Sequence, residues 1–180
     1  RPDPARLAAL EPDLGLLLLV GFTGTEGPGN TELERLLCQA RVGGTLVFGP
    51  NVVDAAQVTA LTTWMRDRAR ACTGRRLLIA TDAEGGEVMR LAPRAGYDPT
   101  PSHQELGDAN DFTMTELEAR RIARMLRAAG ITWNLAPVVD VGYNPANRVI
   151  VGTGRSFSGN PALVTAHARG DEDRILDELM

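Results

Sequence analysis

Acidic residues follow a short apolar run in the middle of the chain, and they are the strongest candidates for chemistry. Residues 77–80 read Leu-Leu-Ile-Ala, and residues 81–90 continue as Thr-Asp-Ala-Glu-Gly-Gly-Glu-Val-Met-Arg. The apolar run does not alternate and is too short for a core helix, so it predicts a fully buried strand. Charge at the end of such a strand is costly to bury unless it is paired or used. Because parallel α/β folds bind ligands at the carboxyl ends of their strands, Asp82 and Glu84 are predicted to lie in a functional site.

A second apolar run also ends in an acid. Residues 131–136 predict a strand, and Pro-Val-Val-Asp140 closes it with a carboxylate. Acids and arginines from separate segments are therefore expected to converge at one sheet edge: Asp82, Glu84, Arg90, Asp140 and Arg155. Paired carboxylates beside an arginine suit the binding of sugar hydroxyls or acid–base work, and the arginine keeps a carboxylate ionised. The alternative is a set of ion pairs that only tie loops together. Two separate strands ending in acids favour the functional interpretation.

The elements that must position these residues follow a regular order. Strands are predicted at residues 16–20, 45–48, 77–80 and 131–136, with a helix opening at the Thr31–Glu34 capping box and another capped by Asp54 and Gln57. Short links in the order β-α-β-α-β imply right-handed crossovers and a parallel sheet. Later helices are expected after a cap at residues 113–116 and from Asn160-Pro161.

The segment from residue 92 to residue 111 is long, irregular and proline-containing, which is typical of a lid or substrate loop. Within it, Ser102 to Glu105 form a second capping-box pattern. That pattern predicts that His103 is an exposed residue at the start of a helix.

Composition excludes several classes of partner. The 180 residues carry a net charge of −4 and only 4% aromatic residues, which disfavours binding to nucleic acid or to an anionic membrane. The apolar run 14–20 is too short to span a bilayer and lacks the flanks of a signal peptide. We therefore expect a cytoplasmic protein, or a secreted one if a signal preceded Arg1, since the chain does not open on Met.

Other chemistries have weaker support. Cys38 and Cys72 are far apart in sequence and predict a buried, reduced pair with neither a disulfide framework nor a zinc site. Residues 154–158 read Gly-Arg-Ser-Phe-Ser and miss the G-x-S-x-G nucleophile elbow at its last position. No lysine completes a phosphate loop. A magnesium site at Asp82 and Asp140 has no further support, so we expect neither a metal nor a cofactor.

Three segments carry a resemblance to a known family. Residues 82–90 resemble the D-Q-E-G-G-R-V-x-R segment of glycoside hydrolase family 3, and residues 136–141 are similar to its A-P-V-x-D-V strand end. Residues 155–157 match its R-S-F/Y element, and the resemblance extends from about Leu16 to Ala168. It is nearest to the bacterial β-N-acetylhexosaminidases, and it implies a TIM-type (β/α)₈ catalytic domain of which about the first four βα units are present. The activity implied is retaining hydrolysis of terminal β-linked N-acetylglucosamine from cell-wall fragments, with a β-glucoside as the alternative substrate.

The resemblance assigns sugar binding to Asp82, Arg90 and Arg155, and it places Asp140 at the same pocket. Ala83 and Glu87 depart from the family's Gln and Arg. The family's K-H-F-x-G-H-G motif, with its acid/base His, is absent, and its nucleophilic Asp lies further on. We therefore expect no catalytic residue in this chain and no turnover by the chain alone.

This absence leaves a second function open, a non-catalytic sugar-binding or interaction module. A third and weaker alternative is an unrelated α/β phosphate or metal binder. Residues 1–169 are expected to form the N-terminal half of the barrel, and residues 170–180 an acidic tail foreign to the fold. The open strand edges of a half barrel favour self-association.

Overall fold

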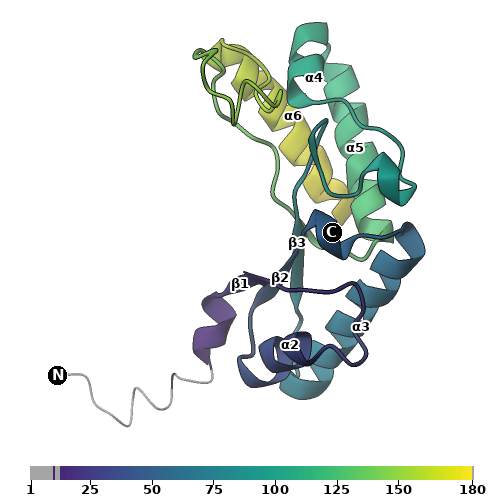
Figure 1. Cartoon of the computed structure of the whole chain (residues 1–180). Coiled ribbons are helices and arrows are strands. Elements are labelled where there is room, and N and C mark those ends of the chain that lie inside the picture. Colours follow the sequence, from purple (N-terminus) through teal and green to yellow (C-terminus); the bar gives the residue numbers. More distant parts are fainter. Residues whose placement is uncertain (1–9, 11–12, 180) are drawn as a thin grey trace, which may run out of the picture. The chain divides into compact units, whose positions relative to one another are not determined.

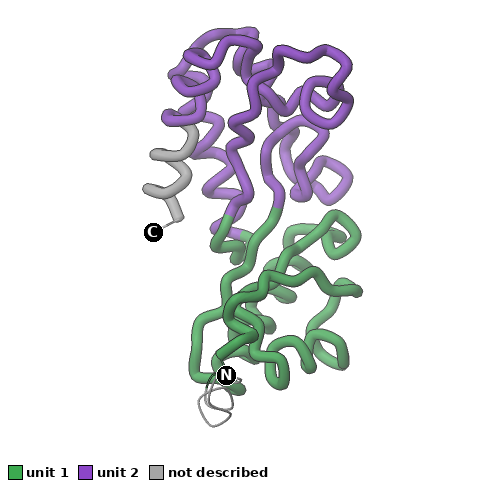
Figure 2. The backbone as a smooth tube through the Cα atoms, turned by 90° about the vertical axis from the view of Figure 1, so that its left-hand side faces the viewer, with its two compact units in different colours: residues 1–81, 129–133 green, residues 82–128, 134–180 purple. Residues whose placement is uncertain are grey.

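The computed structural model describes residue 10 and residues 13–179, so the expectations about Arg1 and Met180 lie outside the described residues. The chain divides into two compact units (Figure 2). Unit 1 comprises residues 1–81 and 129–133, and unit 2 comprises residues 82–128 and 134–180. None of the helices in the described part combines the length and the apolar character that a bilayer span requires.

A four-stranded sheet has the order β1-β2-β3-β6 (Figure 1). Its strands are β1 (Leu19–Gly21), β2 (Gly44–Val47), β3 (Leu78–Thr81) and β6 (Trp133–Asn134). β1 pairs in parallel with β2, and β2 pairs in parallel with β3. The predicted β-α-β-α-β order and parallel sheet are therefore confirmed.

The helices between these strands begin at or beside the predicted caps. α2 (Thr31–Glu34) continues as a π-helical turn, η2 (Arg35–Gln39), and its cap is Asn30 rather than Thr31, because the Asn30 side chain accepts from the Leu33 N–H. η3 (Gly49–Asn51) leads to α3 (Ala55–Thr73), where the Asp54 side chain accepts from the Gln57 N–H at 2.8 Å. α3 ends at Gly74 in the left-handed region, with φ +71.

The leucine run at residues 16–19 forms a strand only at its end, not over its whole length as predicted. Residues 15–17 form a 3₁₀ turn, η1 (Gly15–Leu17), and the strand starts only at Leu19. The Gly15 carbonyl accepts from the Gly43 N–H at 2.9 Å, and pairing with β2 begins at Leu19. Leu17 is 83% exposed and lies before β1, so the strand predicted at residues 16–20 is shorter than expected. Leu78 of β3 is 48% exposed, so the prediction of a fully buried strand at residues 77–80 is wrong. Leu19 and Leu78 share a register row on the sheet face away from Thr45, whose hydroxyl contacts Met65 of α3.

Unit 2 contains a hairpin and three helices. The hairpin strands are β4 (Ala83–Gly85) and β5 (Val88–Met89), which the sequence did not predict, and a short turn η4 (Pro93–Ala95) follows. The helices are α4 (His103–Ala109), α5 (Phe112–Ala128) and α6 (Pro161–Leu179). α5 and α6 lie side by side (Figure 1).

The starts of these helices test the capping predictions. The Ser102–Glu105 capping box is confirmed, and the Asn160 side chain accepts from the Ala162 N–H at 2.9 Å. At α5 the carboxylate of Asp111 accepts from the Thr113 N–H at 2.9 Å, so the cap lies upstream of the predicted residues 113–116. The backbone of α6 runs without a break through the predicted acidic tail as far as Leu179. The boundary at residue 169 stays a prediction.

Candidate functional site

The β4–β5 hairpin brings Arg90 back to Asp82. Asp82 directly follows β3, and the Arg90 N–H donates to its carbonyl at 3.0 Å. The Arg90 guanidinium donates to Oδ2 of Asp82 from Nη2 at 2.7 Å and from Nε at 3.2 Å. Both donors use the same oxygen, so Oδ1 of Asp82 has no protein partner among the described residues. The pairing fixes a carboxylate while leaving one of its oxygens available as a hydrogen-bond acceptor.

Tight backbone packing at the tip shapes this hairpin. Gly85 and Gly86 have φ values of +93 and +58, in the region that favours glycine. A Cβ on Gly85 would stand 2.0 Å from the carbonyl oxygen of Pro101. The motif therefore has glycines here because the backbone conformation favours glycine and because a side chain on Gly85 would collide with the Pro101 carbonyl.

Glu84 and Arg155 form the second ion pair of the site. Arg155 donates from Nε to one carboxylate oxygen at 2.7 Å and from Nη2 to the other at 2.8 Å. This is the fork geometry that gives arginine–carboxylate pairs their directionality. The Glu84 side chain is 3% exposed and that of Arg155 is 24% exposed. A buried carboxylate thus holds the guanidinium in one orientation.

Three acids act on this guanidinium. The pKa of Arg155 is raised, chiefly by the hydrogen bonds to Glu84, and the charges of Asp82 and Asp140 add to the effect. Burial opposes the shift. Asp140 itself is exposed, and its backbone carbonyl accepts from the Ser156 hydroxyl at 2.6 Å. The predicted convergence of these acids and arginines in unit 2 therefore includes both ion pairs and the charge of Asp140.

The loop that carries Arg155 is fixed by the start of α4. The Gln104 N–H donates to the Gly154 carbonyl at 3.0 Å, and His103 Nδ1 lies 3.0 Å from the Arg155 carbonyl oxygen. Since a carbonyl can only accept, Nδ1 carries the proton. The His103 ring also stacks on Phe157, with centroids 4.2 Å apart. The backbone and the side chain of Arg155 are thus held by different residues.

His103 is buried, so the prediction of an exposed helix-start residue is wrong. Its exposed fraction is 2%. Burial lowers the pKa of His103 from 6.5 to about 4, against the hydrogen bond to Arg155, which raises it. A neutral imidazole at physiological pH suits a structural hydrogen bond to the Arg155 loop.

Asn134 is a positioning residue that sequence reasoning missed. Its side chain accepts from the Ala83 N–H and donates to the Ala83 carbonyl, both at 3.0 Å. The amide therefore fixes the residue between Asp82 and Glu84. The only signal was an asparagine inside a predicted strand, where the side chain needs a partner once buried. Ala83 is buried and Glu87 is exposed, so the two departures from the family motif differ in environment.

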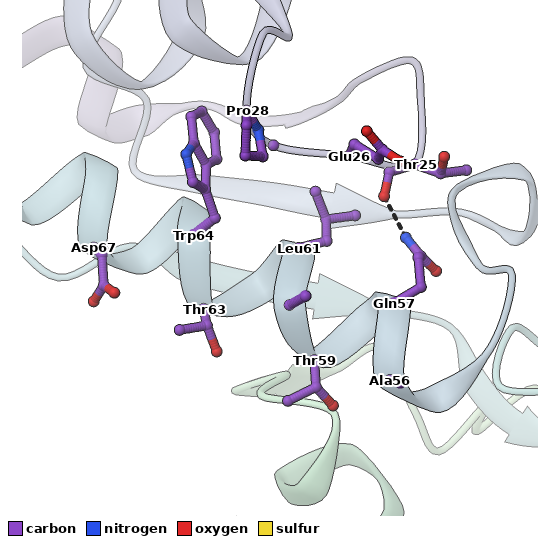
Figure 3. A pocket seen from close by; sticks show the side chains of 12 residues that line it. Thr25, Glu26, Pro28, Ala56, Gln57, Thr59, Leu61, Thr63, Trp64 and Asp67 are labelled. Atoms are coloured by element: carbon purple, nitrogen blue, oxygen red, sulfur yellow. Dashed lines mark hydrogen bonds between the residues drawn. The ribbon is translucent and has the colours of Figure 1, made fainter.

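A separate groove lies in unit 1, between the loop after β1 and α3 (Figure 3). Its volume is about 810 Å³. Trp64 and Pro28 stand on one side of it, and Gln57 donates to the Thr25 carbonyl at the other end. No residue of the predicted sugar site lines this groove.

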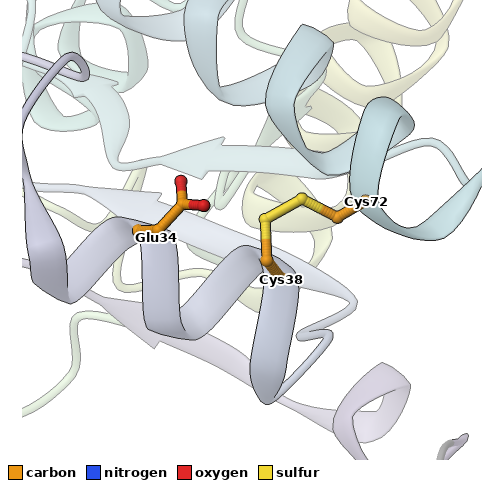
Figure 4. Close-up of side chains that lie close together, drawn as sticks. All are labelled: Glu34, Cys38 and Cys72. Carbon is orange, nitrogen blue, oxygen red and sulfur yellow. A yellow bond between two sulfur atoms is a disulfide. The ribbon is translucent and has the colours of Figure 1, made fainter.

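The two cysteines lie together, contrary to prediction. Cys38 and Cys72 form a disulfide with Cα atoms 5.2 Å apart, and both residues are only half-buried (Figure 4). The prediction of a buried, reduced pair is wrong, because helices η2 and α3 pack side by side and bring distant positions into contact. Glu34 lies beside them (Figure 4), and these three are the residues among those described that could hold a metal ion.

Known proteins similar to this chain are glycosidases. A β-hexosaminidase A of Pseudoalteromonas piscicida is 36% identical over 139 residues, covering 74% of this chain and 23% of that protein. A β-hexosaminidase of Alkalilimnicola ehrlichii is 35% identical over 159 residues, covering 85% of this chain and 42% of that protein. The chain therefore spans less than half the length of these relatives.

Solved structures agree with the sequence relatives. A glycoside hydrolase family 3 β-N-acetylglucosaminidase from Paenibacillus superposes with a TM-score of 0.83 and 34% identity, over 92% of this chain and 31% of that one. A β-N-acetylhexosaminidase from Beutenbergia cavernae gives a TM-score of 0.81 and 27% identity, over 94% of this chain and 51% of that one. The fold is thus of the TIM-barrel type, with only part of the barrel present. Residues 10–170 match the model of the glycosyl hydrolase family 3 N-terminal domain, and the chain belongs to this family.

Proposed function

We propose that this chain supplies the sugar-binding half of a retaining glycosidase that removes terminal β-linked N-acetylglucosamine. The observation that carries the proposal is the bidentate pair of Arg155 with buried Glu84, beside the charges of Asp82 and Asp140. The names of the similar proteins support the substrate class. The partner is a carbohydrate, and the net charge of −4 argues against nucleic acid and anionic membranes as partners.

The proposed roles follow from which atoms stay available. Oδ1 of Asp82 accepts a hydrogen bond from a sugar hydroxyl, while Arg90 fixes the carboxylate from the other oxygen. Arg155 donates to a second hydroxyl, and Glu84 sets its orientation. Asp140 is exposed and its charge acts on Arg155, so it is the last residue that we assign to the sugar site. Fixed donors and acceptors lose little entropy on binding, which is how a small site achieves selectivity.

The bond-breaking groups are proposed to lie outside these 180 residues. A retaining glycosidase needs a nucleophile and an acid/base on opposite sides of the scissile bond. In this chain Asp82 and Glu84 are each paired with an arginine, and such a hydrogen-bonded ion pair suits a binding role. We therefore expect the isolated chain to bind sugar weakly and to show no turnover.

Ligand-observed NMR with N-acetylglucosamine and with glucose tests the site. Asp82→Asn and Arg155→Gln are each expected to weaken binding of N-acetylglucosamine at least tenfold. Exposed residues of the same segments supply matched controls, Glu87→Gln in the hairpin and Arg148→Gln in the loop, and both should bind like the unaltered chain. Binding that survives both site substitutions would refute the assignment, and preference for glucose would favour the β-glucoside alternative.

An assay of aryl N-acetyl-β-glucosaminide hydrolysis by the 180-residue chain tests the proposal that the catalytic groups lie outside it. No release of the aryl group is expected. Turnover that persists after purification to constant specific activity would show that the catalytic groups are present here.

We propose a cytoplasmic location, as composition suggests. Thiol pools keep cysteines reduced in that compartment. The Cys38–Cys72 pair would then be present as a dithiol, whereas export would preserve the disulfide.

A further inference from the structure

The disulfide of unit 1 has a carboxylate within ligand distance. The Sγ atoms of Cys38 and Cys72 and a carboxylate oxygen of Glu34 all lie within 4.8 Å of one another (Figure 4). All three side chains are half-buried, so the cluster is accessible from solvent. The cluster belongs to unit 1, whereas the proposed sugar site belongs to unit 2.

Two helices hold this cluster in place. Glu34 ends α2 and Cys38 belongs to the π-helical turn η2, so they lie one turn apart on one helix. Arg68 and Cys72 occupy the same spacing on α3, and Arg68 donates to Glu34 from Nε at 2.7 Å. Both cross-links span the same sequence separation of 34 residues, as expected for two helices packed in parallel. π-helical turns occur frequently at functional sites.

We propose that Cys38, Cys72 and Glu34 bind a Zn²⁺ ion once their disulfide is reduced. A dithiol reductant supplies two electrons and two protons, so the S–S bond becomes two thiols and the reductant becomes a disulfide. Binding of the ion then replaces the two thiol protons, which are released to solvent. A water molecule completes the fourth position of a tetrahedral site.

Ligand type and charge fit this ion. Zn²⁺ takes thiolate sulfur and carboxylate oxygen in tetrahedral sites, whereas Mg²⁺ and Ca²⁺ prefer oxygen alone. The two thiolates and the Glu34 carboxylate carry three negative charges, which Zn²⁺ and the Arg68 guanidinium balance together. Arg68 donates to Glu34 from Nε at 2.7 Å, so its positive charge lies beside the proposed ligands.

Arg68 competes with the ion for Glu34, and the ion should prevail. The two side chains of the Arg68–Glu34 pair are 40% and 39% exposed, and exposed ion pairs contribute little to stability. Thiolate coordination of zinc is far stronger than such a pair. Arg68 can therefore release one carboxylate oxygen to the metal while keeping its charge close to the site.

Titration of the 180-residue chain with Co²⁺, as a spectroscopic probe for Zn²⁺, tests the proposal. The chain is reduced with a phosphine, the reductant is removed without oxygen, and circular dichroism checks that the helices remain folded. One Co²⁺ per chain should bind with a thiolate-to-cobalt charge-transfer band, and Zn²⁺ should abolish the band. The oxidised chain should show no such band.

Variants separate a built site from adventitious thiol binding. Glu34→Gln should weaken Co²⁺ binding about tenfold or more, whereas Asp67→Asn, a matched charge change on α3 outside the cluster, should leave it unchanged. Cys72→Ser should lose most of the charge-transfer intensity. Absence of the band in the folded, reduced chain would overturn the proposal. Equal affinity in the Glu34→Gln variant would also overturn it, because the dithiol alone would then account for binding.

Discussion

Arg155 and Glu84 meet across 71 residues of sequence and form two parallel hydrogen bonds, of 2.7 and 2.8 Å. The carboxylate is buried, and the guanidinium remains partly open to solvent. Burying a carboxylate is costly, and the paired arginine offsets that cost only in this orientation. The pair therefore fixes the guanidinium of Arg155 before any ligand arrives.

Glu84→Gln should destabilise unit 2 and misplace Arg155. The amide keeps the shape of the carboxylate but loses its charge and can accept only through one oxygen, so the buried pair is broken. We expect a loss of about 2–4 kcal/mol in the free energy of unfolding, measured by urea denaturation. A double-mutant cycle with Arg155→Met isolates the coupling between the two residues. Additive losses in that cycle would mean that the pair contributes nothing.

Acid should weaken the fold through His103. Its folded pKa of about 4 lies below the unfolded value of 6.5, so the unfolded chain takes up the proton first as the pH falls. The contribution is therefore fully present above pH 6.5 and is lost progressively between pH 6.5 and 4. A shift of this size corresponds to about 3 kcal/mol.

Urea denaturation between pH 4 and 8, compared with His103→Asn, measures this contribution. The asparagine amide can still donate to the Arg155 carbonyl but does not titrate. His167, whose pKa is also lowered by burial, titrates in both proteins and cancels in the comparison. Identical pH profiles for the two proteins would rule out His103 as the titrating group.

Reduction of the Cys38–Cys72 disulfide should lower the free energy of unfolding. Without the cross-link the unfolded chain has more conformational freedom and is therefore favoured. For a loop of about 34 residues the chain-entropy estimate is about 4 kcal/mol. Urea denaturation with and without a phosphine reductant measures the loss, and the Cys38→Ser/Cys72→Ser chain should match the reduced protein. If the oxidised and reduced chains have equal midpoints, the cross-link does not stabilise unit 1.

Local sequence signals predicted the parts of this fold that depend on local structure. The Asp54 cap, the Ser102 capping box and the strand-to-helix order needed only neighbouring residues and periodicity, and all are confirmed. The pairing of Cys38 with Cys72 depends on how two helices pack, which no local pattern encodes. Sequence spacing alone therefore did not predict that the two sulfur atoms lie within bonding distance.

In the candidate site, too, locally encoded features were predicted and features that depend on packing were not. Asp82 follows β3 as predicted, because parallel α/β folds place functional residues at strand ends. Asp140 instead lies in a loop six residues beyond β6, so its predicted place at a strand end is wrong. That rule does not predict the partner of each acid, since the pairing of Asp82 with Arg90 depends on a hairpin that the sequence analysis did not predict. The burial of His103 was missed for a related reason. A capping box predicts where a helix starts, but the packing of Phe157 against that helix decides which of its residues meet solvent.

Gly107→Ala tests the packing of the Arg155 loop against α4. A Cβ at this position would stand 1.6 Å from the Phe157 carbonyl oxygen, and backbone there cannot give way as a flexible side chain can. We expect a loss of about 3 kcal/mol or more by overpacking, together with weakened sugar binding, because the segment that carries Arg155 must move. Urea denaturation and ligand-observed NMR measure the two effects.

Gly96→Ala is the matched control, since its φ is +81 but a Cβ there meets nothing within 4 Å. Its cost should be limited to the backbone conformation, about 1 kcal/mol, with sugar binding unchanged. If Gly107→Ala costs no more than Gly96→Ala, close packing against the Phe157 carbonyl does not explain Gly107. Loss of sugar binding with full stability in Gly107→Ala would instead show that the loop moves without unfolding, so that α4 acts on the site only through the position of Arg155.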